Sequence, residues 1–150
     1  NVIRGPSLKS HLMPIWELAL LIQSFDLFEE LHYLFKIKRL LKNWYFENAD
    51  KYLKEITSEL SLKHDLDFKS VKVRNYRSRW GSCSSMGSIF YNWKIIMAPK
   101  KIIRYVVLHE LAHTKIHNHS PRFWSYLKSL YEDIDYPKAW LIKHKNILEL

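Results

Sequence analysis

Two histidines and a glutamate fall within five consecutive residues, in the run His109-Glu110-Leu111-Ala112-His113. Side chains four residues apart lie on one face of an α-helix, so the imidazoles of His109 and His113 can reach one metal ion. Glu110 precedes His113 by three residues, within reach of a water molecule held by that ion. The pattern predicts a zinc-dependent hydrolase in which Glu110 takes a proton from zinc-activated water and returns it to the leaving group.

The third metal ligand is less closely defined by the sequence. Catalytic zinc usually takes three protein ligands and keeps a fourth position for water. His119 follows His113 by six residues and is the leading candidate, provided that the chain leaves the helix near Asn118 and turns back. His117 and Glu132 remain alternatives.

The helices that must position these residues follow from the spacing of apolar side chains. Apolar residues at three- and four-residue intervals predict a helix over residues 37–60 and another over 99–116, which carries the histidines. A third helix is expected from Ser120, which can cap it, with Pro121 in the first turn. A last short helix is expected over residues 138–148.

Two strands are expected between the first two helices. Phe68 to Arg74 alternates apolar and polar residues, as a half-buried strand does, and residues 89–97 read as its hairpin partner after the turn-rich run 81–88. The expected fold is α+β, with a small antiparallel hairpin packed on the metal-binding helix and flanked by other helices. This domain spans residues 37–150; residues 1–36 form a poorly defined N-terminal segment.

Composition limits the class of protein. The chain has 150 residues, 47% of them hydrophobic, which is enough for the core of one domain. A single cysteine, Cys83, excludes an intramolecular disulfide framework, and no apolar run reaches the roughly 18 residues of a membrane span. We therefore expect a cytoplasmic protein that does not enter a membrane.

The net charge of +9 comes from one third of the chain. Residues 71–122 hold ten Lys and Arg but one acid, Glu110, whereas the flanking parts are balanced. Such a segment is either a solvated basic face or a surface that attracts an anionic partner, such as an acidic peptide, a nucleotide or a nucleic acid.

Several short motifs appear in order along the chain. They are Arg79-Trp80-Gly81-Ser82-Cys83-Ser84, Asn92-Trp93, Ala98-Pro99, His109-Glu110-Leu111-Ala112-His113, Asn118-His119-Ser120 and Phe123-Trp124. Together they resemble the YgjP-like family of zinc metallopeptidases, relatives of the SprT-type zincins, and the resemblance covers roughly residues 38–148.

The resemblance implies that His109, His113 and His119 hold zinc and that Glu110 is the catalytic acid/base. It also implies a minimal zincin-like core in which a β-strand beside the active-site helix can pair with an extended peptide or protein substrate. Residues 1–36 do not match the β-rich N-terminal part typical of the family.

The motif at residues 79–84 permits more than one interpretation. Its small residues suit a tight turn, and Trp80 can fill the core. Arg79 or Ser82 could instead bind substrate near the metal. Cys83 is either a small buried residue, which is the commoner role of a free cysteine, or a nucleophile or an extra metal ligand.

Three functions therefore remain open. The leading one is peptide-bond hydrolysis. A zinc-dependent nucleotide pyrophosphatase is the second, although no Gly-rich phosphate loop is visible in the sequence. A nucleic-acid-associated protease is the third, favoured by the pI of about 9.6 but by no helix-turn-helix or zinc-finger pattern.

Overall fold

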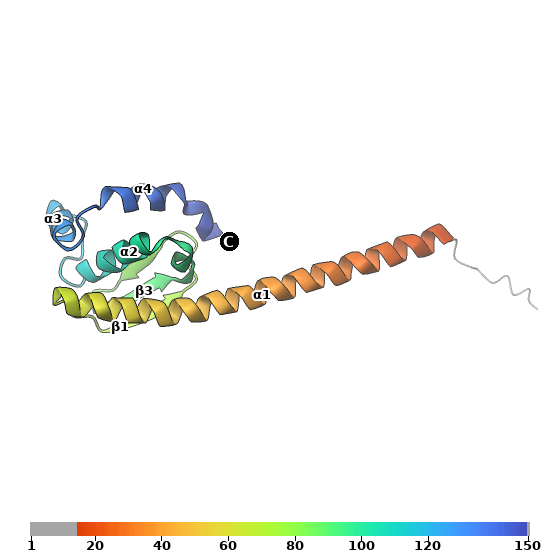
Figure 1. Cartoon of the computed structure of the whole chain (residues 1–150), viewed down its shortest axis with the longest axis horizontal. Coiled ribbons are helices and arrows are strands. Elements are labelled where there is room, and N and C mark those ends of the chain that lie inside the picture. The colour runs from red at the N-terminus through yellow and green to blue at the C-terminus, as the bar shows by residue number, and fades with distance from the viewer. Residues whose placement is uncertain (1–14, 150) are drawn as a thin grey trace, which may run out of the picture. The chain divides into compact units, whose positions relative to one another are not determined.

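The computed structural model describes residues 15–149, so the first 14 residues of the expected N-terminal segment lie outside it. Figure 1 shows the order of the elements along the chain. They are α1 (Ile15–His64), β1 (Ser70–Arg74), β2 (Gly81–Cys83), β3 (Ser88–Asn92), the 3-10 helix η1 (Trp93–Met97), α2 (Lys100–Ala112), α3 (Pro121–Leu130), α4 (Asp135–Lys143) and the 3-10 helix η2 (Lys145–Glu149).

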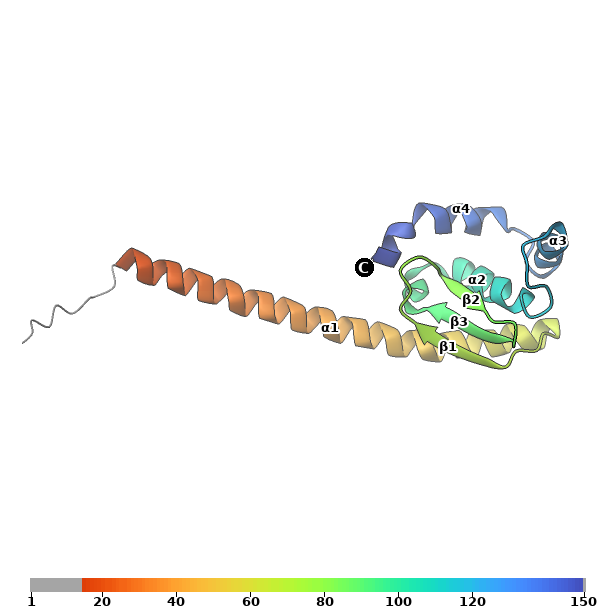
Figure 2. The ribbon, with the colours of Figure 1, turned by 180° about the vertical axis from the view of Figure 1, so that it is seen from behind.

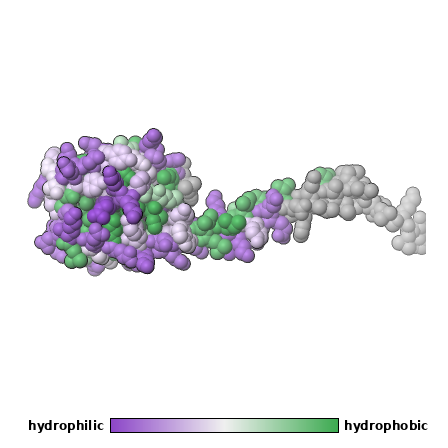
Figure 3. Space-filling view, in the orientation of Figure 1, coloured by the Kyte–Doolittle hydropathy of each residue, from purple (hydrophilic) through white to green (hydrophobic). Residues whose placement is uncertain are grey.

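The chain divides into two units, Asn1–Leu40 and Leu41–Leu150. The described part of the first unit is helical throughout. Leu20 and the large apolar side chains between Leu27 and Leu40 are exposed, as the green patches along the helix in Figure 3 show. The helix was expected to begin at residue 37, but in the structure it begins at Ile15. Within residues 15–149, no helix is both long enough and apolar enough to cross a bilayer.

The second unit begins with the C-terminal part of α1, which contributes one face to the core. Ala49, Leu53, Ile56 and Leu60 are buried at intervals of four, three and four residues, as the sequence pattern predicted. Thr57 lies on the same face, and its hydroxyl is 3.2 Å from that of Tyr91 in β3. This face of α1 therefore packs on the sheet.

The sheet has three strands in the order β1-β3-β2, which corrects the expected hairpin. β1 pairs with β3 in parallel, Val71 opposite Ile89, and the antiparallel partner of β3 is β2, within the run expected to be only a turn. Figure 2 shows the strands in front of α1 and α2, so the helices cover one face. Alternation along a strand reports its buried face but not the direction of its neighbour, so the sequence pattern could not separate the two pairings.

The second strand also ends earlier than expected. β3 stops at Asn92, and residues 93–97 form a 3-10 helix instead of continuing the strand. The buried amide of Asn92 accepts a hydrogen bond from the N–H of Lys94 and donates to the carbonyls of Tyr76 and Arg79. These bonds stabilise the turn out of the sheet and fix the loop that leads into β2.

The remaining helices lie close to their expected positions. Pro99 is the N-cap of α2, and the helix ends at Ala112, earlier than the predicted residue 116. Ser120 precedes α3 as expected, but its side chain makes no capping hydrogen bond. The last helix, expected over residues 138–148, is divided in the structure. Its first part is α4, which begins at Asp135, and its second part is the separate 3-10 helix η2.

Candidate metal site and active site

Helix α2 is the rigid support of the site. Nine of its thirteen residues are buried, Val107 and Leu111 completely, which fixes the helix in the core. His109 and Glu110 project from its last turn, and His113 is its C-cap residue. The expected helical placement of the motif is therefore present, with His113 at the point where the chain leaves the helix.

The imidazoles of His109, His113 and His119 converge on one point. Nε2 of His119 lies 3.0 Å from Nε2 of His109 and 3.1 Å from Nε2 of His113. Two nitrogens bound to one zinc ion at about 2.0–2.1 Å in tetrahedral geometry are about 3.3 Å apart, close to both distances. Among residues 15–149, these three histidines form the one group of potential ligands this compact, and His117 is outside it.

The loop after α2 and the start of α3 orient two of these rings. Nδ1 of His113 is 2.9 Å from the carbonyl oxygen of Ile116, a contact that leaves Nε2 free to bind a metal. Phe123 stacks on the His113 ring at 4.3 Å, and Trp124 stacks on the exposed His119 ring at 5.3 Å. The Phe123-Trp124 pair therefore supports the side of the site formed by the loop.

The imidazole of His109 is uncharged near pH 7, as a metal ligand must be. Burial, followed by the neighbouring His113 and His119, lowers its pKa to about 3, so the ring is neutral near pH 7. Its Nδ1 is buried without a hydrogen-bond partner. Burial likewise lowers the pKa of His113. Neutral imidazole nitrogens are the donors that zinc prefers, so these residues fit the ion that the motif implies.

Glu110 lies beside the three histidines and is almost fully buried. Burial raises the pKa of its carboxyl to about 8, against the opposing effect of the Arg79 charge. A carboxylate with a raised pKa holds a proton more strongly and is therefore a better general base. The side chain fits only because residue 81 is a glycine: a Cβ there would lie 2.6 Å from Oε1 of Glu110.

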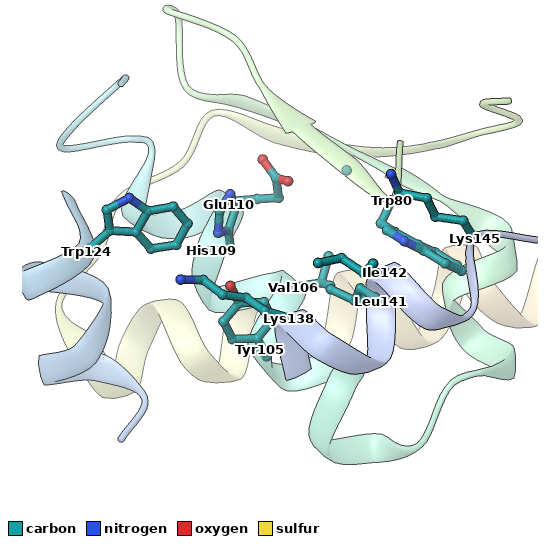
Figure 4. A pocket seen from close by; sticks show the side chains of 11 residues that line it. Trp80, Tyr105, Val106, His109, Glu110, Trp124, Lys138, Leu141, Ile142 and Lys145 are labelled. Atoms are coloured by element: carbon teal, nitrogen blue, oxygen red, sulfur yellow. The ribbon is translucent and has the colours of Figure 1, made fainter. Parts of the chain in front are cut away.

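A pocket of about 400 Å³ opens beside His109 and Glu110. Figure 4 shows it from close by. Its walls are mostly apolar and come from β2 and its approach, α2, α3, α4 and the start of η2. The polar side chains among them include Tyr105, His109, Glu110, Lys138 and Lys145. The site thus combines a candidate metal centre, a buried carboxylate and room for a substrate side chain.

Comparisons with known proteins agree with this geometry. The sequence model of the family described as YgjP-like, metallopeptidase domain, matches residues 29–144. The chain belongs to the YgjP-like family. No curated protein matches the sequence.

Two solved structures share the fold of this YgjP-like domain. One is the metallopeptidase zymogen jannalysin of Methanocaldococcus jannaschii, with 20% identity and a TM-score of 0.53 over 61% of this chain and 95% of that one. The other is the metallopeptidase zymogen abylysin of Pyrococcus abyssi, with 18% identity and a TM-score of 0.54 over 65% of this chain and 95% of that one. Both likenesses support the predicted zincin-like α+β core.

The residues of the 79–84 motif are divided between the pocket and its surroundings. Trp80 and Gly81 line the pocket, whereas Arg79 and Ser82 do not. Arg79 is exposed, with its guanidinium 5.4 Å from the centre of the Tyr76 ring. Cys83 is half-buried, and burial together with the charge of Glu110 raises the pKa of its thiol to about 11, which is typical of an inert cysteine.

The basic segment does not form one free face in the YgjP-like domain. Lys94 is buried and donates a hydrogen bond to the carbonyl of Leu148, and Arg104 pairs with Glu59. Neither the family nor the two related structures points to a nucleotide or a nucleic acid. The lysines that line the pocket, Lys138 and Lys145, instead come from the C-terminal part of the chain, where local sequence offered no signal.

Proposed function

We propose that this YgjP-like domain is a zinc-dependent peptidase with His109, His113 and His119 as the metal ligands and Glu110 as the general base. The observation that carries the proposal is the convergence of the Nε2 atoms of three histidines, one of which lines a pocket together with the buried carboxyl of Glu110. Bound zinc would supply Lewis acidity, polarising a water molecule and the carbonyl of the substrate.

Glu110 acts as the general base and then as the general acid in the proposed reaction. Its carboxylate accepts a proton from the attacking water and later donates that proton to the departing amine nitrogen. The apolar surroundings that raise its pKa to about 8 make the carboxylate a stronger base than an exposed glutamate, and the positive charge of a bound zinc ion would oppose this shift and favour the ionised form near neutral pH.

The substrate is held along β2. Because β2 pairs only with β3, its other edge is free of any strand in the described part of the chain. An extended peptide can add to such an edge through main-chain hydrogen bonds. Gly81 opens this strand and touches Glu110, so a peptide paired there would pass beside the carboxylate. Ser82, at the centre of β2, is placed to contact this peptide, and Arg79 lies just before the strand.

The ligand assignment is tested by zinc binding. The purified chain should hold about one zinc per molecule, and zinc should raise its melting temperature. Replacing His109, His113 or His119 by alanine should remove the metal and the stabilisation, whereas His117→Ala serves as the matched control and should keep both. A protein that binds no zinc, or that loses it in His117→Ala only, would overturn the assignment.

The catalytic role of Glu110 is tested separately. Glu110→Gln keeps the size of the side chain but cannot accept a proton at neutral pH. We expect it to retain zinc and to lose on the order of 100-fold or more in the rate of casein cleavage. Retention of cleavage within a few-fold of the unmodified chain would show that Glu110 has a structural role.

A further inference from the structure

The pocket beside Glu110 contains a feature that hydrolysis itself does not require. Two lysines, Lys138 and Lys145, line it together with apolar walls formed by Trp80, Val106, Leu141 and Ile142. Figure 4 shows the two lysines at opposite ends, with Lys138 on the side of His109 and Trp124 and Lys145 on the side of Trp80. The pocket is therefore an apolar trough with a cation at each end.

Lys138 is held in place by contacts that leave its charge without a counterion. Its Nζ lies 3.6 Å from the centre of the Trp124 ring, a cation–π contact that restricts the side chain. The ion pairs found within residues 15–149 join Lys54 to Asp50 and Arg104 to Glu59, and neither involves a pocket lysine. The ammonium group therefore stays available to an incoming anion.

The position of this ammonium beside the candidate metal site has an electrostatic cost. Lys138 and His109 line the same pocket, so a divalent ion bound by His109 would face a second positive charge. A negatively charged group of the substrate between them would reduce this repulsion and form a charge-assisted hydrogen bond with Nζ. The apolar walls would bind the adjoining hydrocarbon part of the same substrate.

We propose that Lys138 is a specificity-determining residue that selects peptides carrying a carboxylate next to an apolar group at the site of cleavage. The proposal rests on the proposed peptidase function and names its substrate class. The carboxylate can be an acidic side chain or the C-terminus of the peptide, and both present the same oxygens to Nζ.

Four peptides test whether the preferred carboxylate is an acidic side chain or the C-terminus of the peptide. N-acetyl-Leu-Leu-Glu-Leu-Leu-amide is compared with its Gln analogue, and N-acetyl-Leu-Leu-Leu-Leu is compared as a free acid and as an amide. For the zinc-loaded chain we measure Kd by titration calorimetry and kcat/KM by chromatography of the products. At least one carboxylate peptide should be favoured about tenfold over its neutral partner, and the preference should weaken as salt increases.

Substitutions at position 138 assign the preference to the lysine. Lys138→Met should abolish the carboxylate preference, measured as the ratio of Kd values and of kcat/KM values between each carboxylate peptide and its neutral partner. Lys138→Arg should retain most of this ratio. Lys143→Met is the matched control, because Lys143 lies on the same helix, is exposed and does not line the pocket. A carboxylate preference that survives in Lys138→Met would come from the metal or another cation and would overturn the proposal.

The design separates this inference from the peptidase proposal. If the chain cleaves all four peptides without a carboxylate preference, the peptidase stands and the role of Lys138 is refuted. If it cleaves none but binds carboxylate peptides more tightly in a Lys138-dependent manner, the binding role stands and the peptidase proposal fails. Absence of both cleavage and preferential binding overturns both.

Discussion

Gly81 and Glu110 are in contact across the boundary between β2 and α2: a Cβ at position 81 would lie 2.6 Å from Oε1 and 2.9 Å from Cδ of Glu110. The backbone of β2, the proposed substrate-binding strand, thus forms one wall around the proposed general base. The carboxylate of Glu110 in α2 can occupy its position because residue 81, in β2, has no side chain.

Gly81→Ala should therefore impair both catalysis and stability. The added methyl group meets Oε1, Cδ and Cγ of the buried Glu110, which must shift to make room, so we expect the free energy of unfolding to fall by about 1–3 kcal/mol. Displacing the carboxylate by about 1 Å should lower the rate of peptide cleavage by on the order of 100-fold while zinc stays bound. Ser85→Ala, in the exposed turn after β2, is the control; an equally active Gly81→Ala would contradict the contact.

Cys83 should be unreactive in the folded protein. Burial, and secondarily the charge of Glu110, raises the pKa of its thiol to about 11, so only about 0.1% is thiolate at pH 8. Alkylation by iodoacetamide, followed by mass spectrometry, should be on the order of 100-fold slower than in urea. Because the thiolate is the reactive form, the rate should rise with pH up to about 11. Rapid modification at pH 8 would indicate an activated cysteine.

Thr57 and Tyr91 should be energetically coupled. Tyr91 is fully buried, and its hydroxyl lies 3.2 Å from Oγ1 of Thr57, which also bonds the carbonyl of Leu53. Thr57→Val leaves the Tyr91 hydroxyl without this partner and should cost about 1–3 kcal/mol, whereas Tyr91→Phe should cost about 1 kcal/mol.

A double-mutant cycle by urea denaturation tests this asymmetry. In the double variant no buried hydroxyl is left unpaired, so its cost should be smaller than the sum of the two single costs. Ser58→Ala, exposed on the same helix, should change stability by no more than about 0.5 kcal/mol. Strict additivity would show that the two hydroxyls do not interact.

Lys94 should act as a structural residue and not as part of an anion-binding surface. It is 3% exposed, and its Nζ lies 2.6 Å from the carbonyl oxygen of Leu148, to which it donates a hydrogen bond. Lys94→Glu would place a buried carboxylate against that carbonyl and should lower the free energy of unfolding by roughly 3 kcal/mol or more. The exposed Lys100→Glu should have little effect. Equal stability of the two variants in urea would contradict the burial of Lys94.

Local periodicity predicted most of the helices because apolar residues recur along them at three- and four-residue intervals. It did not predict the helix over residues 15–36, because the sequence from Trp16 to Phe35 is largely apolar with scattered acids and singles out no such spacing. The sequence favoured His119 over His117 as the third ligand but left His117 open, since both follow α2 in an irregular loop. In the structure it is His119 that lies with the other two histidines. Lys138 is 28 residues beyond Glu110 in the sequence, so its place in the pocket depends on tertiary packing alone.

The strand order β1-β3-β2 leaves the sheet with two open edges, and they differ in chemistry. β1 carries exposed Lys72 and Arg74, whereas the outer edge of β2 carries no charged residue. Charged side chains on an edge strand discourage the addition of another strand, including one from a second molecule. If β2 captures extended chains as proposed, the charges on β1 would discourage the opposite edge of the sheet from forming the same hydrogen bonds with a second molecule.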